Sequence, residues 1–187
     1  MKRLALLVIL VSALTACSGT GADGSLDVTG TADTVVTGPD VTPPQLMGVA
    51  LEELVTKDHT FEQGPPPFTV YLVLSHLDPR SGSPDRDHGG GRRLTAPERA
   101  AIEDTIGPFG PLRWIDDPDQ WRTDDLRPTI DGAVILGVGQ PTSDGDTASV
   151  PVSLWCGGLC GTWLTYRLTL VDGTWQVTGT EGPIAIA

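Results

Sequence analysis

Positive charge is scarce in this chain of 187 residues. Twelve Lys and Arg stand against 24 Asp and Glu, which gives a formal net charge of −12 at pH 7. Proteins that bind nucleic acid or anionic lipid headgroups by electrostatic attraction carry an excess of basic residues. The composition therefore argues against both kinds of partner. Solubility alone is enough to explain the acidity.

The sequence motifs of common enzyme classes are also missing. There is no Gly-x-Ser-x-Gly, no His-Glu-x-x-His and no phosphate-binding loop. Ser75 and His76 are adjacent, so on a strand they would point to opposite faces and could not form a nucleophile–base pair directly. We therefore expect a non-catalytic domain without a cofactor.

The apolar run near the N-terminus, from Leu4 to Leu14, is too short to cross a bilayer, which needs roughly 20 residues. It follows Lys2 and Arg3 and precedes small residues, a pattern typical of a signal peptide. The stretch Leu14-Thr15-Ala16-Cys17 resembles the lipobox of bacterial lipoproteins. This resemblance implies that residues 1–16 are a signal peptide, that cleavage precedes Cys17, and that Cys17 carries a diacylglyceryl group and an acylated amine.

Lipid on Cys17 would be the protein's link to the membrane. Each buried CH₂ contributes about 0.8 kcal/mol, so two or three acyl chains anchor a protein stably without a transmembrane helix. We expect an exported protein on the outer face of the cytoplasmic membrane, or on the outer membrane if the cell has one. Residues 17–41 are rich in Gly, Thr, Ser, Asp and Ala and are predicted to be a flexible tether. Residues 42–187 would then form one domain.

Hydrophobic spacing predicts two helices and several strands in this domain. Leu46, Ala50 and Leu54 recur at helical spacing after Thr42. Thr95 and Glu98 form a capping-box pattern at the start of a second helix, which Gly107-Pro108 ends. Apolar, β-branched segments predict strands at 68–75, 112–115 and 133–138. Turn regions are expected at 116–127 and 139–145, and a short strand at 183–187.

Two turn patterns specify the C-terminal third. A Cys156–Cys160 bridge across Gly157-Gly158-Leu159 and a two-residue turn at Asp172-Gly173 each fix a hairpin register. Both registers put the same apolar residues on one face, and a slip of one residue in either would break this agreement. The registers pair Ala148 with Leu168, Val150 with Tyr166, Val152 with Leu164, Leu168 with Val177, and Leu170 with Trp175.

Together these elements predict an α+β fold: two helices packed on an antiparallel sheet that ends in a three-stranded meander. The element order is similar in outline to small cystatin-like or NTF2-like folds. The segment from Cys156 to Gly161, with Asp172-Gly173 and Trp175, also resembles a C-terminal signature of uncharacterised bacterial proteins. That signature implies no catalytic residue.

The pair Cys156 and Cys160 allows three interpretations. In an oxidising compartment it is expected to form a disulfide that closes the hairpin. A redox-active pair or a copper site are the alternatives, but both kinds of motif precede a helix in thioredoxin-like proteins, whereas a strand is predicted after Cys160.

Two further groups of residues are candidates for ligands. His76, Asp78, Asp85, Asp87 and His88 lie in a long polar loop that could bind Zn²⁺. Trp155, Trp163 and Arg167 share one sheet face in the predicted register and could stack on a small ligand or a protein partner; helices covering that face are the alternative. We therefore expect a non-catalytic binding or accessory domain, with redox or metal handling (copper or zinc) through Cys156 and Cys160 or the His76–His88 loop as the alternative.

Overall fold

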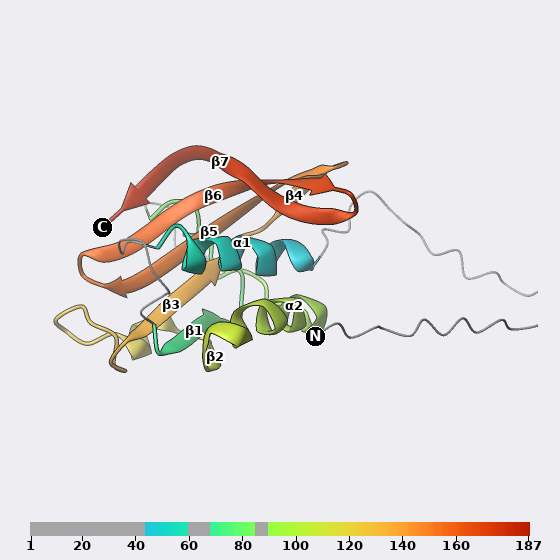
Figure 1. The fold of residues 1–187 in the computed structure, drawn as a ribbon. Coiled ribbons are helices and arrows are strands. Elements are labelled where there is room, and N and C mark those ends of the chain that lie inside the picture. Colours follow the sequence, from blue (N-terminus) through green and yellow to red (C-terminus); the bar gives the residue numbers. More distant parts are fainter. Residues whose placement is uncertain (1–43, 60–67, 85–89) are drawn as a thin grey trace, which may run out of the picture. The chain divides into compact units, whose positions relative to one another are not determined.

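Seven strands form one mixed sheet in the computed structural model, which describes residues 44–59, 68–84 and 90–187 (Figure 1). These residues belong to one compact unit, 37–187. The predicted signal peptide, Cys17, the tether and Thr42 lie outside the described residues, as do Asp85, Asp87 and His88. The elements are α1 (Gln45–Thr56), β1 (Val70–Leu74), α2 (Ala96–Ile106), η1 (Gly107–Phe109), β2 (Leu112–Ile115), η2 (Pro118–Trp121), β3 (Ala133–Val138), β4 (Thr142–Asp144), β5 (Thr147–Gly157), β6 (Cys160–Val171) and β7 (Thr174–Ile186).

The strand order is β2-β1-β3-β5-β6-β7, with β4 paired to β5 beside this path. The fold is α+β as predicted, but the sheet is not wholly antiparallel, because β1 pairs in parallel with both β2 and β3. Parallel pairs need long crossover connections, and α2 and the segment after β2 supply them. The near-continuous apolar sequences of β1 and β3 are typical of parallel strands that are buried on both faces.

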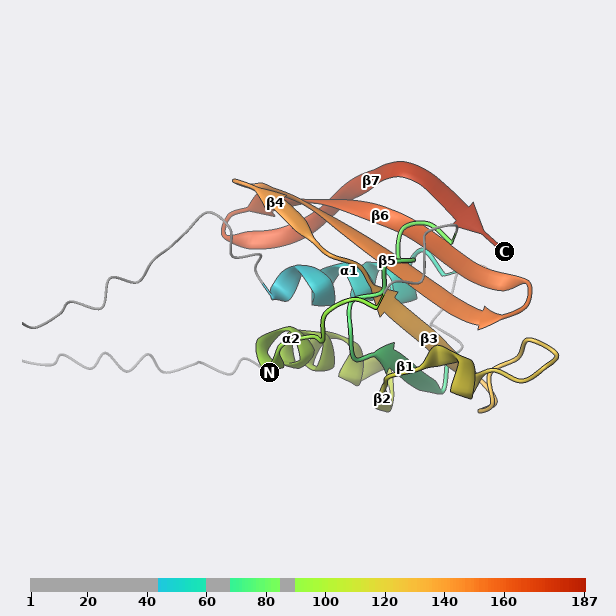
Figure 2. The same ribbon diagram turned by 180° about the vertical axis from the view of Figure 1, so that it is seen from behind.

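The two helices cover one face of the sheet. Both views show α1 between the meander strands and α2 (Figures 1 and 2). The predicted apolar stripe of α1 is buried, and Ile102 and Ile106 of α2 are fully buried in the same core. The helices approach closely at Gly48, where a Cβ atom would lie 2.7 Å from the carbonyl oxygen of Ala101.

The predicted meander is confirmed, and all five residue pairs occur in the predicted register. Two details differ from the prediction. Residues 142–144, expected in a turn, form β4 on the edge of β5. The expected short strand at 183–187 is the continuation of β7, which stays paired to β6 through two register shifts. Such bulges bend a strand while keeping it in the sheet.

The predicted capping box at the start of α2 is present and includes a third partner. The Glu98 carboxylate accepts hydrogen bonds from the Thr95 backbone N–H at 2.7 Å and from Arg92 Nη1 and Nη2 at 2.8 and 2.6 Å. Glu98 is buried, and the hydrogen bond from Arg92 is the main cause that holds its pKa below the ordinary value of 4.5.

We expect Glu98→Gln to lower the free energy of unfolding at pH 7 by about 2 kcal/mol, since it weakens hydrogen bonds to a charged group. Because the folded-state pKa is lowered, this stability is present above pH 4.5 and is lost as the pH falls through the folded pKa. Urea unfolding at pH 7 and pH 3 should therefore show a variant effect that shrinks at pH 3. Asp104→Asn, an exposed position on the same helix, is the control. An equal loss at both pH values would contradict the role of the charge.

Candidate ligand-binding site

The sheet face opposite the helices carries Ser153 and Trp155 on β5 and Trp163 on β6. In the hairpin register Ser153 pairs with Trp163 and Trp155 pairs with Gly161, so the two indoles are diagonal neighbours. Both tryptophans are half-buried. A loop covers part of this face instead of a helix: Gly82 donates its N–H to the Val152 carbonyl oxygen at 3.0 Å. The structure therefore does not support the alternative in which helices bury both tryptophans.

A pocket of about 50 Å³ opens between this face and the loops that cover it. The loop after β1 and the end of η2 each bring an arginine to it. The lining side chains with polar or aromatic character are Asp78, Arg80, Arg122, Ser153, Trp155 and Trp163, and Leu74, Pro84, Pro118, Ile135 and Gly137 complete the wall.

Arg122 lies against one of the two tryptophans of the pocket. Its guanidinium carbon lies 4.5 Å from the centroid of the Trp155 ring, in a cation–π contact. Burial is the main cause that lowers its pKa, and the charge of Arg80 adds to the effect. Its Nε–H is buried and has no hydrogen-bond partner among the described residues. A buried donor without a partner costs about 1–3 kcal/mol, and a ligand oxygen that reached this N–H would remove that cost.

Asp78 fixes Arg80 and ties the loop to the sheet. Its Oδ1 accepts from the Arg80 backbone N–H at 3.0 Å and lies 3.6 Å from Arg80 Nε. Its Oδ2 accepts from Ser153 Oγ at 3.2 Å. Gly137 leaves the necessary space, since a Cβ there would lie 2.7 Å from Oδ2 of Asp78. The buried carboxylate is thus fully engaged in positioning the pocket.

A second, wider pocket of about 410 Å³ adjoins the first and shares Leu74, Asp78, Arg80 and Pro118 with it. It adds His76, Asp117 and Asp119 to the lining. These residues follow the carboxyl ends of the parallel strands β1 and β2. The next two strands of the chain, β2 and β3, lie on either side of β1. In open parallel sheets such an end is where ligands bind.

The structure brings two of the three predicted ligand residues together. Trp155 and Trp163 line the small pocket, whereas Arg167 lies four residues beyond Trp163 on β6 and lines a different pocket with Ser149 and Glu181. Sequence reasoning missed Arg80 and Arg122, because both lie in connections whose paths the sequence does not specify. Two features of the sequence could have identified them. Arg80 follows shortly after β1, and Arg122 is a basic residue in an acidic segment.

Of the five residues of the predicted His and Asp cluster, the structure describes His76 and Asp78, and both line the wider pocket. His59 is buried with its ring edge-on to Phe68 at 6.4 Å, while His76 lies in the wider pocket. The acidic segment after β2 includes the short helix η2, and Asp117 caps it by accepting from the Asp119 N–H at 2.9 Å. Within 44–59, 68–84 and 90–187, no three His, Cys, Asp or Glu side chains are grouped to hold a metal ion.

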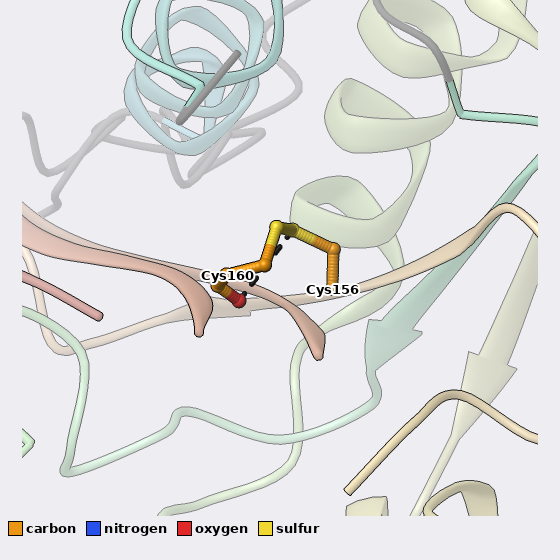
Figure 3. Close-up of a disulfide and its surroundings, with 2 residues drawn as sticks. All are labelled: Cys156 and Cys160. Carbon is orange, nitrogen blue, oxygen red and sulfur yellow. Dashed lines mark hydrogen bonds between the residues drawn. A yellow bond between two sulfur atoms is a disulfide. The ribbon is translucent and has the colours of Figure 1, made fainter. Parts of the chain in front are cut away.

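Cys156 and Cys160 form a disulfide at the tip of the β5–β6 hairpin, with Cα atoms 5.1 Å apart (Figure 3). Strand β6 begins at Cys160, as predicted, so no helix follows the pair as it would in a thioredoxin-like motif. This arrangement supports the interpretation of the pair as a covalent closure of the hairpin.

We expect the double variant Cys156→Ser, Cys160→Ser to lose about 2 kcal/mol of unfolding free energy, because so short a loop gains little from closure in the chain-entropy model. Urea unfolding of the oxidised wild type and the double variant measures this loss. A variant as stable as the wild type would argue against a structural role for the bridge.

Comparison of the chain with protein-family models, with curated proteins and with solved structures found no match. In the described part of the chain, no helix is long and apolar enough to cross a membrane.

Proposed function

We propose that this chain is a lipid-anchored protein of the cell envelope whose α+β domain binds a small ligand in the Trp155–Trp163 pocket without transforming it. The lipobox-like stretch ending at Cys17 and the Gly- and Thr-rich residues after it support anchoring through lipid and a tether. The membrane attachment is then the lipid on Cys17. The expected location is the outer face of the cytoplasmic membrane, or the outer membrane where one exists.

The observation that carries the binding function is the pocket itself. Two indoles and two guanidiniums converge there from four separate segments, and a buried Asp78–Ser153 hydrogen bond holds the loop against the sheet. A few well-placed polar groups beside aromatic walls are typical of ligand sites. These side chains can bind a ligand and hold it in one orientation. The Ser153 hydroxyl donates to a carboxylate and has no histidine beside it in the pocket lining, so the arrangement supports binding rather than acyl transfer.

A fragment screen followed by NMR tests this function in the full chain, purified in detergent and labelled with ¹⁵N at tryptophan. The five indole N–H signals report on five places in the molecule, and single Trp→Phe variants assign them. We expect binding fragments to shift the signals of Trp155 and Trp163 and to leave those of Trp114 and Trp175 in place. Fragments that move all five signals alike, or none that moves these two, would contradict the proposal.

A further inference from the structure

We propose that the ligand is a small organic carboxylate, and that Arg80 and Arg122 bind its carboxylate group. This inference rests on the proposed binding function and specifies the ligand class of that same pocket.

The charges in the pocket favour an anion. Arg80 has the buried Asp78 as its counter-ion, and both Asp78 oxygens are already engaged. Among the described residues, the ion-pair partner of Arg122 is Asp119, at 3.4 Å, and that carboxylate is 80% exposed. The carboxylates of Asp78 and Asp117 also act on the charge of Arg122, without an ion pair. Exposed ion pairs of this kind contribute little. The guanidinium of Arg122 is thus half-buried beside another cation, and the buried carboxylate that acts on it, Asp78, is already engaged by Arg80 and Ser153.

The geometry favours a planar oxyanion. The Arg122 guanidinium carbon lies 4.5 Å from the centroid of the Trp155 ring, and its buried Nε–H has no hydrogen-bond partner among the described residues. A guanidinium group is planar and presents a fork of donors that matches a carboxylate or phosphate in a bidentate pair. A water needs roughly 10–15 Å³, so a pocket of about 50 Å³ accommodates one such group and little more.

The adjoining wider pocket favours a carboxylate over a phosphate. Asp117 and Asp119 line it, and the chain as a whole carries a net charge of −12. A phosphate dianion would be repelled more strongly than a monoanion. The same carboxylates and His76 can accept hydrogen bonds from hydroxyl or amino groups on the body of the ligand. We therefore infer a hydroxy- or amino-carboxylate whose head occupies the small pocket and whose body extends into the wider one.

The test uses matched probes on the full chain in detergent, with the Trp155 and Trp163 indole signals as the readout. Lactate and lactamide differ in the carboxylate alone, as do glycine and glycinamide, and inorganic phosphate is the competing oxyanion. We expect lactate or glycine to shift both indole signals saturably and to bind at least tenfold more tightly than its amide and than phosphate.

Variants of Arg122 test whether its guanidinium group, and not only its positive charge, binds the carboxylate. Arg122→Gln should weaken carboxylate binding at least tenfold, and Arg122→Lys should restore only part of it because a lysine lacks the fork. Arg99→Gln is the matched control, since Arg99 also stacks at 4.5 Å on a tryptophan, Trp114, but does not line the pocket. We expect Arg99→Gln to bind the probes as the wild type does. A thermal melt of each variant confirms folding.

The outcomes distinguish this inference from the function on which it rests. Carboxylate shifts that survive Arg122→Gln, or phosphate binding tighter than lactate and glycine, would overturn the assignment of the ligand class. If only amides or other uncharged fragments shift Trp155 and Trp163, the pocket binds a ligand but not a carboxylate. If neither the carboxylates nor uncharged fragments shift these two signals, both proposals fail.

Discussion

Cys17→Ser is expected to abolish lipid attachment completely. The lipobox resemblance places the modified sulfur on Cys17, and serine offers no thiol for the diacylglyceryl group. Cells supplied with an alkyne-tagged fatty acid should label the wild-type chain and leave the variant unlabelled. Since cleavage would follow lipid transfer, the variant should also accumulate as a longer precursor.

Two controls make this experiment specific. Ser18→Ala, next to the modified residue, should keep the label, and so should Cys156→Ser, which removes a different thiol. Label that persists on Cys17→Ser, or that disappears with Cys156→Ser instead, would contradict the assignment of the lipid to Cys17.

Leu164→Ala is expected to lower the free energy of unfolding by about 2–5 kcal/mol, the usual cost of truncating a fully buried leucine. Leu164 is 1% exposed and lies opposite Val152 in the core that the helices cover. Its neighbour Thr165 faces the other side of β6 and is half-buried. Urea unfolding should show that Thr165→Ala costs less than about 1 kcal/mol.

This pair of variants tests the register of the meander. A shift of one residue would exchange the two faces, and the larger loss would then fall on Thr165→Ala. Equal losses at both positions would contradict the burial of one face under the helices.

The meander could be predicted because its register is set by short-range chemistry. The five-residue disulfide hairpin and the Asp172-Gly173 turn each fix which residues pair, and period-two alternation then fixes the buried face. Asp172 adopts a positive φ of 50°, as the first residue of such a turn requires. The start of α2 was predictable for the same reason, since the Thr95 capping box is local.

The parallel half of the sheet depends on long-range choices that local patterns do not encode. Strands β2 and β3 flank β1 although 17 residues separate them, and only the paths of the connections decide this order. The same paths bring Arg80 and Arg122 to the tryptophans. Sequence analysis could therefore place Trp155 and Trp163 on one face but could not supply the arginines, and it included Arg167, which the strand carries beyond the pocket.

The most direct test of the proposed tethered envelope protein is the intact mass of the chain purified from native membranes, before and after reduction and alkylation. We predict a chain that begins at Cys17, carries two or three acyl chains, and gains two alkyl groups only after reduction, at Cys156 and Cys160. An unlipidated chain, or one that still carries residues 1–16, would contradict the anchor and with it the proposed location of the binding domain.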